Sequence, residues 1–246
     1  MSIVNSTIVD RVIPNTHLYN FVLVEYFTDF PRELKGCMTI NPSLALAQRI
    51  GILGGTFDPV HWGHLVMAET AQSQAHLDVV IWIPTSNPHY KRVAQPTPLV
   101  HRLAMVQRAI ADHPHFTVST DDEAQTGRSF AIDTLVNLQD RYPDRCWFWI
   151  IGTDALQTLP KWYRYHDLIT RCVWLIAPRS GHEMIIPPDM PSNCWQLLHM
   201  PLIGLSSSLI RQYVQQGQSI RYLVPDAVRA YITAHRLYQP NFPTNS

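Results

Sequence analysis

The sequence lacks the features that mark several classes of protein. It contains no run of roughly 18 to 20 apolar residues, the length that a helix needs to cross a bilayer, and it does not open with a basic region followed by an apolar block. Its 19 basic and 19 acidic side chains cancel, so no overall charge favours nucleic acid or an anionic membrane. We therefore expect a cytoplasmic protein with no nucleic-acid or membrane partner, in which local charge holds any anionic ligand.

Cysteine is scarce and shows no recognisable pattern. The four cysteines form no CxxC pair and no zinc spacing, and two of them lie inside apolar runs, as buried thiols do in a reducing compartment. We therefore assign no residue of the chain as a metal ligand. The four are Cys37, Cys146, Cys172 and Cys194.

Short apolar runs alternate with amphipathic stretches from residue 49 onward. A chain of 246 residues with 46% hydrophobic side chains can bury the core of one main domain. Apolar runs separated by helical periods are typical of a parallel sheet covered on both faces. The sequence therefore predicts an α/β fold, a Rossmann-like open parallel sheet with helices on both faces. Strands are expected over 49–54, 79–83, 116–119, 146–151 and 172–177, and helices over 63–76, 98–112, 130–141, 207–216 and 225–236.

We assign residues 49–238 to this domain and interpret 239–246 as a frayed tail. Residues 1–48 follow no sustained periodicity. They are interpreted either as an appended segment or as residues that precede an alternative start at Met38, and we assign them no function.

The stretch GGTFDPVHWGH directly follows the first predicted strand. In an open parallel sheet, ligands bind beyond the carboxyl ends of the strands, where a glycine turn lets backbone amides approach a phosphate. Gly54 and Gly55 stand at that position. We expect Thr56 and Phe57 to supply amides and to cover a nucleotide.

The same stretch sets His61 and His64 three residues apart at the start of a predicted helix. Residues at this spacing share one face of the first turn, where unpaired amides and the helix dipole favour negative charge. Two imidazoles beside a phosphate can donate hydrogen bonds and stabilise the charge that develops during phosphoryl-group transfer. The pattern indicates a nucleotidyl-transfer site; the alternative is that the glycines merely turn the chain and the histidines are packed or solvated.

A second stretch, GLSSSLIR, places small hydroxyl residues just before a late helix. Ser206 and Ser207 can cap that helix and offer amides and hydroxyls to a phosphate, while Arg211 lies one turn in and can reach the same anion. The alternative is an ordinary serine N-cap.

Together these stretches resemble the HxGH and ISSTxIR motifs of the nucleotidylyltransferase superfamily, and GGTFDPVHWGHL is similar to the form found in bacterial nicotinate-nucleotide adenylyltransferases. The resemblance implies transfer of AMP from ATP to nicotinate mononucleotide, which forms nicotinate adenine dinucleotide and pyrophosphate. It implies His61 and His64 at the α- and β-phosphates, with Lys91 and Arg211 on the triphosphate. It also implies Mg²⁺ that bridges the phosphates and is bound mainly by substrate oxygens and water.

The segment from Gly152 to Tyr163, which reads GTDALQTLPKWY, resembles the family's GxD...W block. There the aspartate, Asp154 in this chain, helps to organise the nucleotide site, and the tryptophan, here Trp162, stacks on the pyridine ring. A tryptophan offers a flat face to a planar heterocycle at low entropic cost. Alternatively, Asp154 caps a helix at 155–159 and Trp162 belongs to the core.

The stretch RSFAIDTL at 128–135 resembles the family's SYTxDTL, in which amides at a helix start receive the acceptor's carboxylate. The resemblance implies that the backbone amides of Ile132 and Tyr163 bind the acceptor. Ala131 stands where the family commonly has threonine, so nicotinamide mononucleotide stays open as an alternative acceptor.

The stretch NPHYK departs from the family's PPHK but keeps Lys91 in register, where it can neutralise phosphate as a mobile charge. This departure leaves a non-catalytic nucleotide-binding module as an alternative of a different class.

A closing segment at 222–232 also resembles the family and is interpreted as a packed helix. A homo-oligomer is possible.

Overall fold

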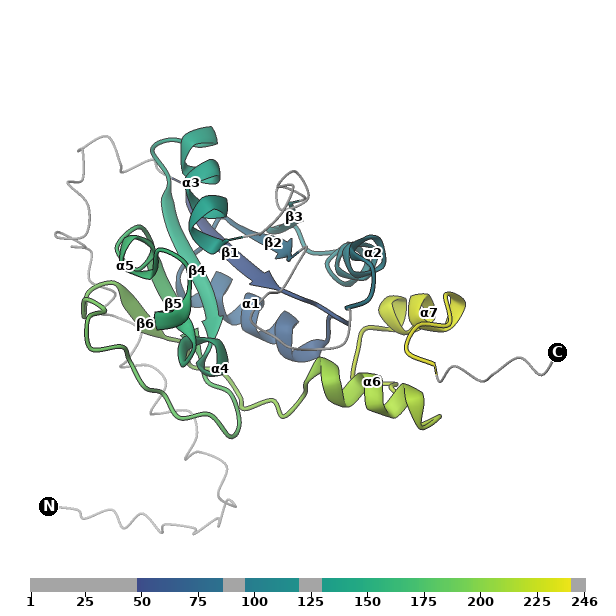
Figure 1. Cartoon of the computed structure of the whole chain (residues 1–246). Helices are drawn as coiled ribbons and strands as arrows, with labels where there is room; N and C mark the ends of the chain where they lie inside the picture. Colours follow the sequence, from purple (N-terminus) through teal and green to yellow (C-terminus); the bar gives the residue numbers. More distant parts are fainter. Residues whose placement is uncertain (1–47, 86–95, 120–129, 240–246) are drawn as a thin grey trace, which may run out of the picture.

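The computed structural model describes residues 48–85, 96–119 and 130–239. They form one six-stranded sheet in the order β3-β2-β1-β4-β5-β6, and all its strand pairs are parallel (Figure 1). This confirms the predicted Rossmann-like parallel sheet. The strands are β1 (Arg49–Gly55), β2 (Val79–Pro84), β3 (Phe116–Val118), β4 (Cys146–Gly152), β5 (Val173–Ala177) and β6 (Trp195–Leu197).

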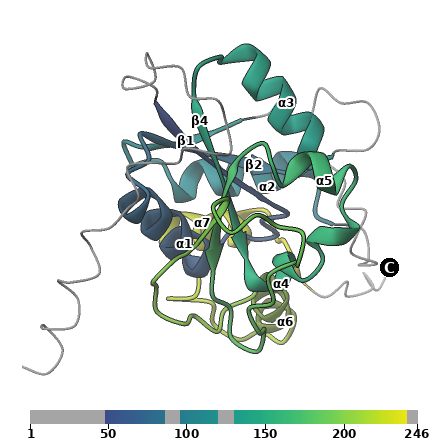
Figure 2. The same ribbon diagram turned by 90° about the vertical axis from the view of Figure 1, so that its left-hand side faces the viewer.

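Helices cover both faces of the sheet, as predicted. Figure 2 shows α1 and α3 on opposite sides of the strands. Residues of α1, α2, α6 and α7 pack into one hydrophobic cluster, and residues of α3, α4 and α5 pack into the other. The helices are α1 (Trp62–Gln74), α2 (Leu99–Ala109), α3 (Ala131–Arg141), α4 (Thr153–Leu156), α5 (Tyr165–Leu168), α6 (Ser207–Gln215) and α7 (Asp226–Ala234), with a 3-10 turn at Leu159–Lys161.

The central strands supply both clusters because successive residues of a strand point to opposite faces. On β1, Leu53 belongs to the cluster under α1, whereas Ile52 belongs to the cluster under α3. On β4, Ile150 and Trp149 divide in the same way. Burial on both faces explains why these strands are continuous apolar runs in the sequence.

The order of the strands reverses between β1 and β4. The chain runs from β1 outward to β2 and β3, then returns to the other side of β1 with β4 and continues to β5 and β6. Neighbouring loops diverge at such a point, and the crevice lies at the carboxyl ends of the strands. The topology therefore places a ligand site beside the ends of β1 and β4.

The prediction missed four short elements, which are β6, α4, α5 and the 3-10 turn, although it found the equally short β3. Each has only three or four residues, too few to complete a recognisable period. The predicted N-terminal segment, apart from Gln48, and the predicted tail, apart from Gln239, lie outside the described residues. Among the described helices, none combines the length and the apolar character that crossing a membrane requires.

Candidate active site

A cavity of about 750 Å³ lies at the carboxyl ends of β1 and β4, where the strand order reverses. Eleven of the residues predicted for the site line this cavity. They come from the end of β1 and the loop and first turn of α1 that follow it, from the segment after β4, and from the start of α6. Ile132 and Tyr163 do not line it, and Lys91 lies outside the described residues. The eleven are Gly54, Gly55, Thr56, Phe57, His61, His64, Asp154, Trp162, Ser206, Ser207 and Arg211.

The predicted glycine turn after β1 is wrong. Gly54 and Gly55 are the last residues of the strand, and neither has a positive φ. Phe57 has a φ of 47°, and the turn follows it at Asp58 and Pro59. Gly55 is needed for packing, because a Cβ there would lie 2.9 Å from the Phe57 ring. A side chain at position 55 would thus displace the ring of Phe57, just before the turn.

The ring of Phe57 is directed into the core and is only 2% exposed. It packs against Trp82 at 5.3 Å between centroids and meets the ring of His64 edge-on at 5.1 Å. The ring therefore packs against His64 from the side of the core. Because it is buried, it cannot cover a nucleotide in the way that the sequence predicts.

The two histidines form a stacked pair at the start of α1. His61 is the N-cap of this helix and His64 is its third residue. Their rings are 3.8 Å apart with an interplanar angle of 26°. The backbone N–H of His61 donates to Nδ1 of His64 at 3.3 Å, so the neutral ring of His64 has its proton on Nε2 and can donate it to a ligand.

His61 is almost fully buried, with 1% of its surface exposed. Burial, together with the positive charge of Arg179, lowers its pKa from 6.5 to about 3. The ring is thus neutral at physiological pH, and it can contribute a hydrogen bond to a phosphate but not a full positive charge.

Arg179, which sequence reasoning missed, supplies a guanidinium to the cavity. It follows β5 and is held by its backbone N–H, which donates to Oγ1 of Thr153 at 3.0 Å, and by Nη1, which donates to the carbonyl of Leu205 at 3.3 Å. Its Nε lies 3.5 Å from Oδ1 of Asp154. The one available signal was a basic residue just after a buried strand, at the edge of the sheet where ligands bind.

Asp154 lies in the first turn of α4 and does not cap a helix, because Gly152 is the N-cap. A Cβ at position 152 would collide with the carboxylate of Asp154 and press on the side chain of Arg179. Glycine at the end of β4 therefore allows this acid and this arginine to approach each other beside the cavity.

At the start of α6 the serine side chains bind the protein itself. Oγ of Ser206 accepts a hydrogen bond from the N–H of Leu209 at 3.1 Å, which is an ordinary N-cap. Oγ of Ser207 donates to the carbonyl of Pro59 at 2.8 Å, and Nη1 of Arg211 donates to the carbonyl of Asp58 at 2.7 Å. The helix is thus fastened to the histidine loop, and its first backbone amides are the groups best suited to an anion.

Trp162 lines the cavity and is half-buried. Its indole N–H donates to Oγ1 of Thr158 at 3.4 Å, and the rings of Trp149 and Trp174 meet it edge-on at 6.5 and 6.4 Å. These contacts orient the indole at the wall of the cavity, so the core and cavity interpretations of this residue both hold.

The other two predicted acceptor contacts lie elsewhere. The side chain of Ile132 is fully buried in the core, and that of Tyr163 is 53% exposed and packs on Phe130 at 4.4 Å between ring centroids. Phe130 is the N-cap of α3, so this contact brings the N-terminus of α3 beside the segment after Trp162. The binding of an acceptor by the amides of Ile132 and Tyr163 stays a prediction.

Among the described residues, no three His, Cys, Asp or Glu side chains are grouped to hold a metal ion. Two carboxylates from these residues line the cavity. That of Asp58 accepts hydrogen bonds from Thr97 and Tyr238, and that of Asp154 is paired with Arg179. This donor set suits an ion that arrives on substrate phosphates and keeps its water ligands, which is the usual behaviour of Mg²⁺.

Comparison with known proteins places the chain in a family. The cytidylyltransferase-like family model matches residues 52–213. A protein of Trichormus variabilis described as a probable nicotinate-nucleotide adenylyltransferase is 48% identical in an alignment of 205 positions that covers 78% of this chain and 97% of that protein. One of the same description from a Synechococcus strain is 46% identical over 205 residues, with coverage of 81% and 99%.

A solved structure has the same fold. Plasmodium falciparum nicotinic acid mononucleotide adenylyltransferase, complexed with NaAD, superposes with a TM-score of 0.64 at 17% identity, over 78% of this chain and 97% of that one. At such low identity the likeness supports the fold only. The family follows from the sequence relatives, which match nearly along their whole length: this chain belongs to the nicotinate-nucleotide adenylyltransferase family of cytidylyltransferase-like proteins.

Proposed function

We propose that this protein transfers AMP from ATP to nicotinate mononucleotide, forming nicotinate adenine dinucleotide and pyrophosphate. One observation supports this most directly: His61, His64, Arg179 and Arg211, from three distant parts of the chain, line one cavity that Trp162 also lines. Hydrogen-bond donors and positive charge suit phosphates, and an indole face suits a planar base. The cytoplasm, where ATP is abundant, is the compartment in which we place the reaction.

In this reaction an oxygen of the acceptor's 5′-phosphate attacks the α-phosphorus of ATP. A bond forms between that oxygen and the α-phosphorus, while the bond to the oxygen that bridges the α- and β-phosphates breaks and pyrophosphate leaves. The attacking phosphate is already ionised near neutral pH, so no general base and no protein nucleophile are needed. Catalysis then depends on alignment of the two phosphates and on stabilisation of the charge that builds up between them.

The roles of the chain follow from this requirement. His64 donates a hydrogen bond from Nε2 to an oxygen of the reacting phosphates, and neutral His61 holds the loop and the stacked ring in place. Arg179, which follows β5, and Arg211, which lies in α6, both supply positive charge to the cavity. Lys91, which lies outside the described residues, is proposed to add a further charge on the triphosphate.

Magnesium is proposed as the accompanying ion, held by substrate phosphates and water. When bound, it neutralises charge on the phosphates. In the described part of the chain, the one carboxylate at the cavity that could also hold the ion would be Asp154, whose side chain is 37% exposed although it lies 3.5 Å from Nε of Arg179.

A pyrophosphate-release assay tests the proposal. Purified protein receives ATP and magnesium with nicotinate mononucleotide, with nicotinamide mononucleotide, or with no acceptor. We expect release with the nicotinate acceptor and a kcat/KM at least tenfold higher than with the amide. A higher value with the amide would reverse the acceptor assignment, which Ala131 keeps open.

A non-catalytic nucleotide-binding module is the competing function, motivated by the altered NPHYK stretch. It predicts that ATP raises the melting temperature of the protein but that no pyrophosphate is released with either acceptor. That pair of results would overturn the transferase proposal.

A further inference from the structure

The carboxylate of Asp58 is a buried junction between three segments of the chain. Asp58 is 6% exposed and precedes the histidine pair on the loop after β1. Its Oδ1 accepts a hydrogen bond from the hydroxyl of Tyr238 at 2.7 Å, and its Oδ2 accepts one from the backbone N–H of Thr97 at 3.2 Å. Thr97 lies just before α2, and Tyr238 follows α7, 180 residues after its partner.

Asp58 and its neighbour Pro59 also hold the start of α6, through their backbone carbonyl groups. The carbonyl of Asp58 accepts from Nη1 of Arg211 at 2.7 Å, and that of Pro59 accepts from Oγ of Ser207 at 2.8 Å. The side chain of Asp58 therefore binds the C-terminal segment, and its backbone carbonyl binds Arg211, which lines the cavity.

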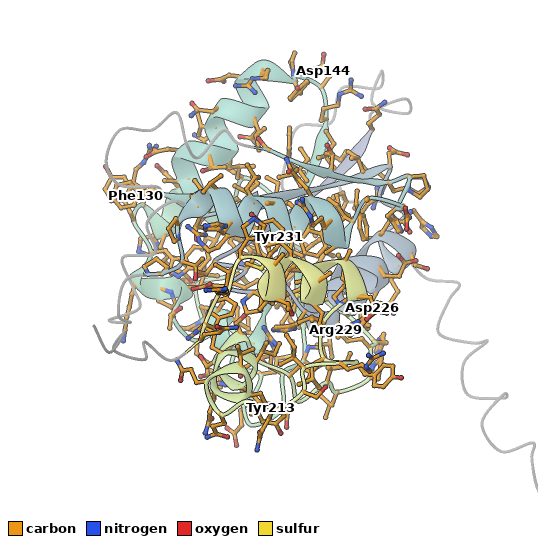
Figure 3. The ribbon with its side chains drawn as sticks, turned by 90° about the vertical axis from the view of Figure 1, so that its right-hand side faces the viewer. Phe130, Asp144, Tyr213, Asp226, Arg229 and Tyr231 are labelled. Atoms are coloured by element: carbon orange, nitrogen blue, oxygen red, sulfur yellow. The ribbon has the colours of Figure 1, made fainter. Side chains whose placement is uncertain are left out.

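Tyr238 is well placed to fix this junction. It packs partly against the hydrophobic cluster formed by α1, α2, α6 and α7, and its φ of 63° is unfavourable for a residue with a Cβ. Burial and the nearby charge of Asp58 raise the pKa of Tyr238, so its hydroxyl stays protonated and donates. Figure 3 shows α7, which leads into Tyr238, lying across α2 and beside α6.

From these contacts we propose that Tyr238 is a positioning residue for the transfer reaction. Its hydroxyl fixes the carboxylate of Asp58, and the backbone carbonyl of Asp58 in turn fixes the guanidinium of Arg211. Tyr238 does not line the cavity, so it acts through Asp58 and not on the substrate. This inference rests on the proposed function, because it concerns the geometry of the same site.

The first test compares two tyrosine-to-phenylalanine variants. Tyr238→Phe removes the hydroxyl at the junction. Tyr222→Phe is the matched control: Tyr222 also has a positive φ, of 68°, but its side chain is 82% exposed and does not line the cavity. Assays are made well below the melting temperature of both variants, so that the protein is folded in each.

For Tyr238→Phe we expect kcat to fall by about tenfold, as for the loss of one hydrogen bond to a charged group, while the KM for the mononucleotide stays within about twofold. The control should match the wild type. A kcat within about twofold of the wild type for Tyr238→Phe would overturn the inference, as would an equal loss in the control.

The second test is a double-mutant cycle between Tyr238→Phe and Arg211→Ala. If the hydroxyl acts through Arg211, its removal should change kcat by less than about threefold once the arginine is absent. A full tenfold loss in that background would mean that Tyr238 does not act through Arg211, and this would overturn the inference.

The two proposals fail in different ways in these assays. A folded wild-type protein that releases no pyrophosphate overturns the proposed function and this role with it. An active wild type whose Tyr238→Phe variant is unimpaired overturns only the positioning role.

Discussion

The backbone N–H of His61 donates a 3.3 Å hydrogen bond to Nδ1 of His64, and the two imidazole rings stack 3.8 Å apart. The hydrogen bond selects the tautomer of His64, because Nδ1 must accept and the proton of the neutral ring therefore lies on Nε2. The edge-on ring of Phe57 fixes the same imidazole from another side. The loop after β1 thus presents one oriented donor to the cavity before any substrate binds.

His64→Ala removes this donor and should lower kcat by about 10²- to 10³-fold, the usual cost of losing one preorganised donor to developing charge. The melting temperature should change little, because His64 is only partly buried at the cavity wall. His199→Ala is the control, since His199 is exposed and outside the cavity lining. Steady-state kinetics that show a loss below about fivefold for His64→Ala would contradict the role.

His61 should make the stability of the protein depend on pH. Its pKa is about 3 in the folded protein and 6.5 in the reference state, so between these values the unfolded chain binds a proton that the folded chain does not. The free energy of unfolding should therefore fall as the pH falls below 6.5, by up to about 1.4 kcal/mol per pH unit from this residue.

Chemical denaturation at pH 7 and pH 5 measures this effect, with His61→Gln as the comparison. Glutamine cannot titrate, so the variant should lose less stability than the wild type between the two pH values. Equal losses in the two proteins would show that burial does not lower the pKa of His61.

The central part of the fold is predictable because it depends on local pattern. β1, β2 and β4 are apolar runs buried on both faces, and their predicted ends agree with the observed ends to within one residue. By contrast, β6 has three residues, and its pairing with β5 depends on a long connection that has no period of its own. Its existence is a result of tertiary structure and is not encoded in a local pattern.

The site is predictable where one short stretch contains the chemistry. His61, His64 and Arg211 lie in such stretches, and all three line the cavity. Arg179 does not, since its position beside Asp154 arises only because β5 pairs with β4, with Ala177 opposite Gly152. The contact between Tyr238 and Asp58 spans 180 residues and is equally invisible to spacing.

Arg179→Gln should lower kcat/KM for ATP by about 10²-fold, because it removes a positive charge from a cavity proposed to bind a triphosphate. Arg179→Lys should restore little, since an ammonium cannot reproduce the contacts that the guanidinium makes with Leu205 and Asp154. The control is Arg221→Gln, at an exposed position outside the cavity lining. If kcat/KM for Arg179→Gln stayed within about threefold of the wild type, this arginine would have no part in binding ATP.

Trp162 provides a test of where the acceptor lies. Trp162→Ala removes the indole from the cavity wall and should raise the KM for the mononucleotide by about tenfold, in line with 1 to 3 kcal/mol for stacking of a base on an aromatic ring. The KM for ATP should stay within about twofold, because the histidines and arginines that are proposed to bind it come from other segments.

Trp162→Phe retains a flat ring and should recover most of the affinity lost in Trp162→Ala, whereas a purely structural role would leave it impaired. The comparison is informative because Trp149 and Trp174 lie at 74° and 69° to the plane of the indole, so neither ring stacks in parallel on it. An alanine variant that raises the KM for ATP and for the mononucleotide equally would place Trp162 outside the acceptor subsite. It would then act as a support for the whole cavity.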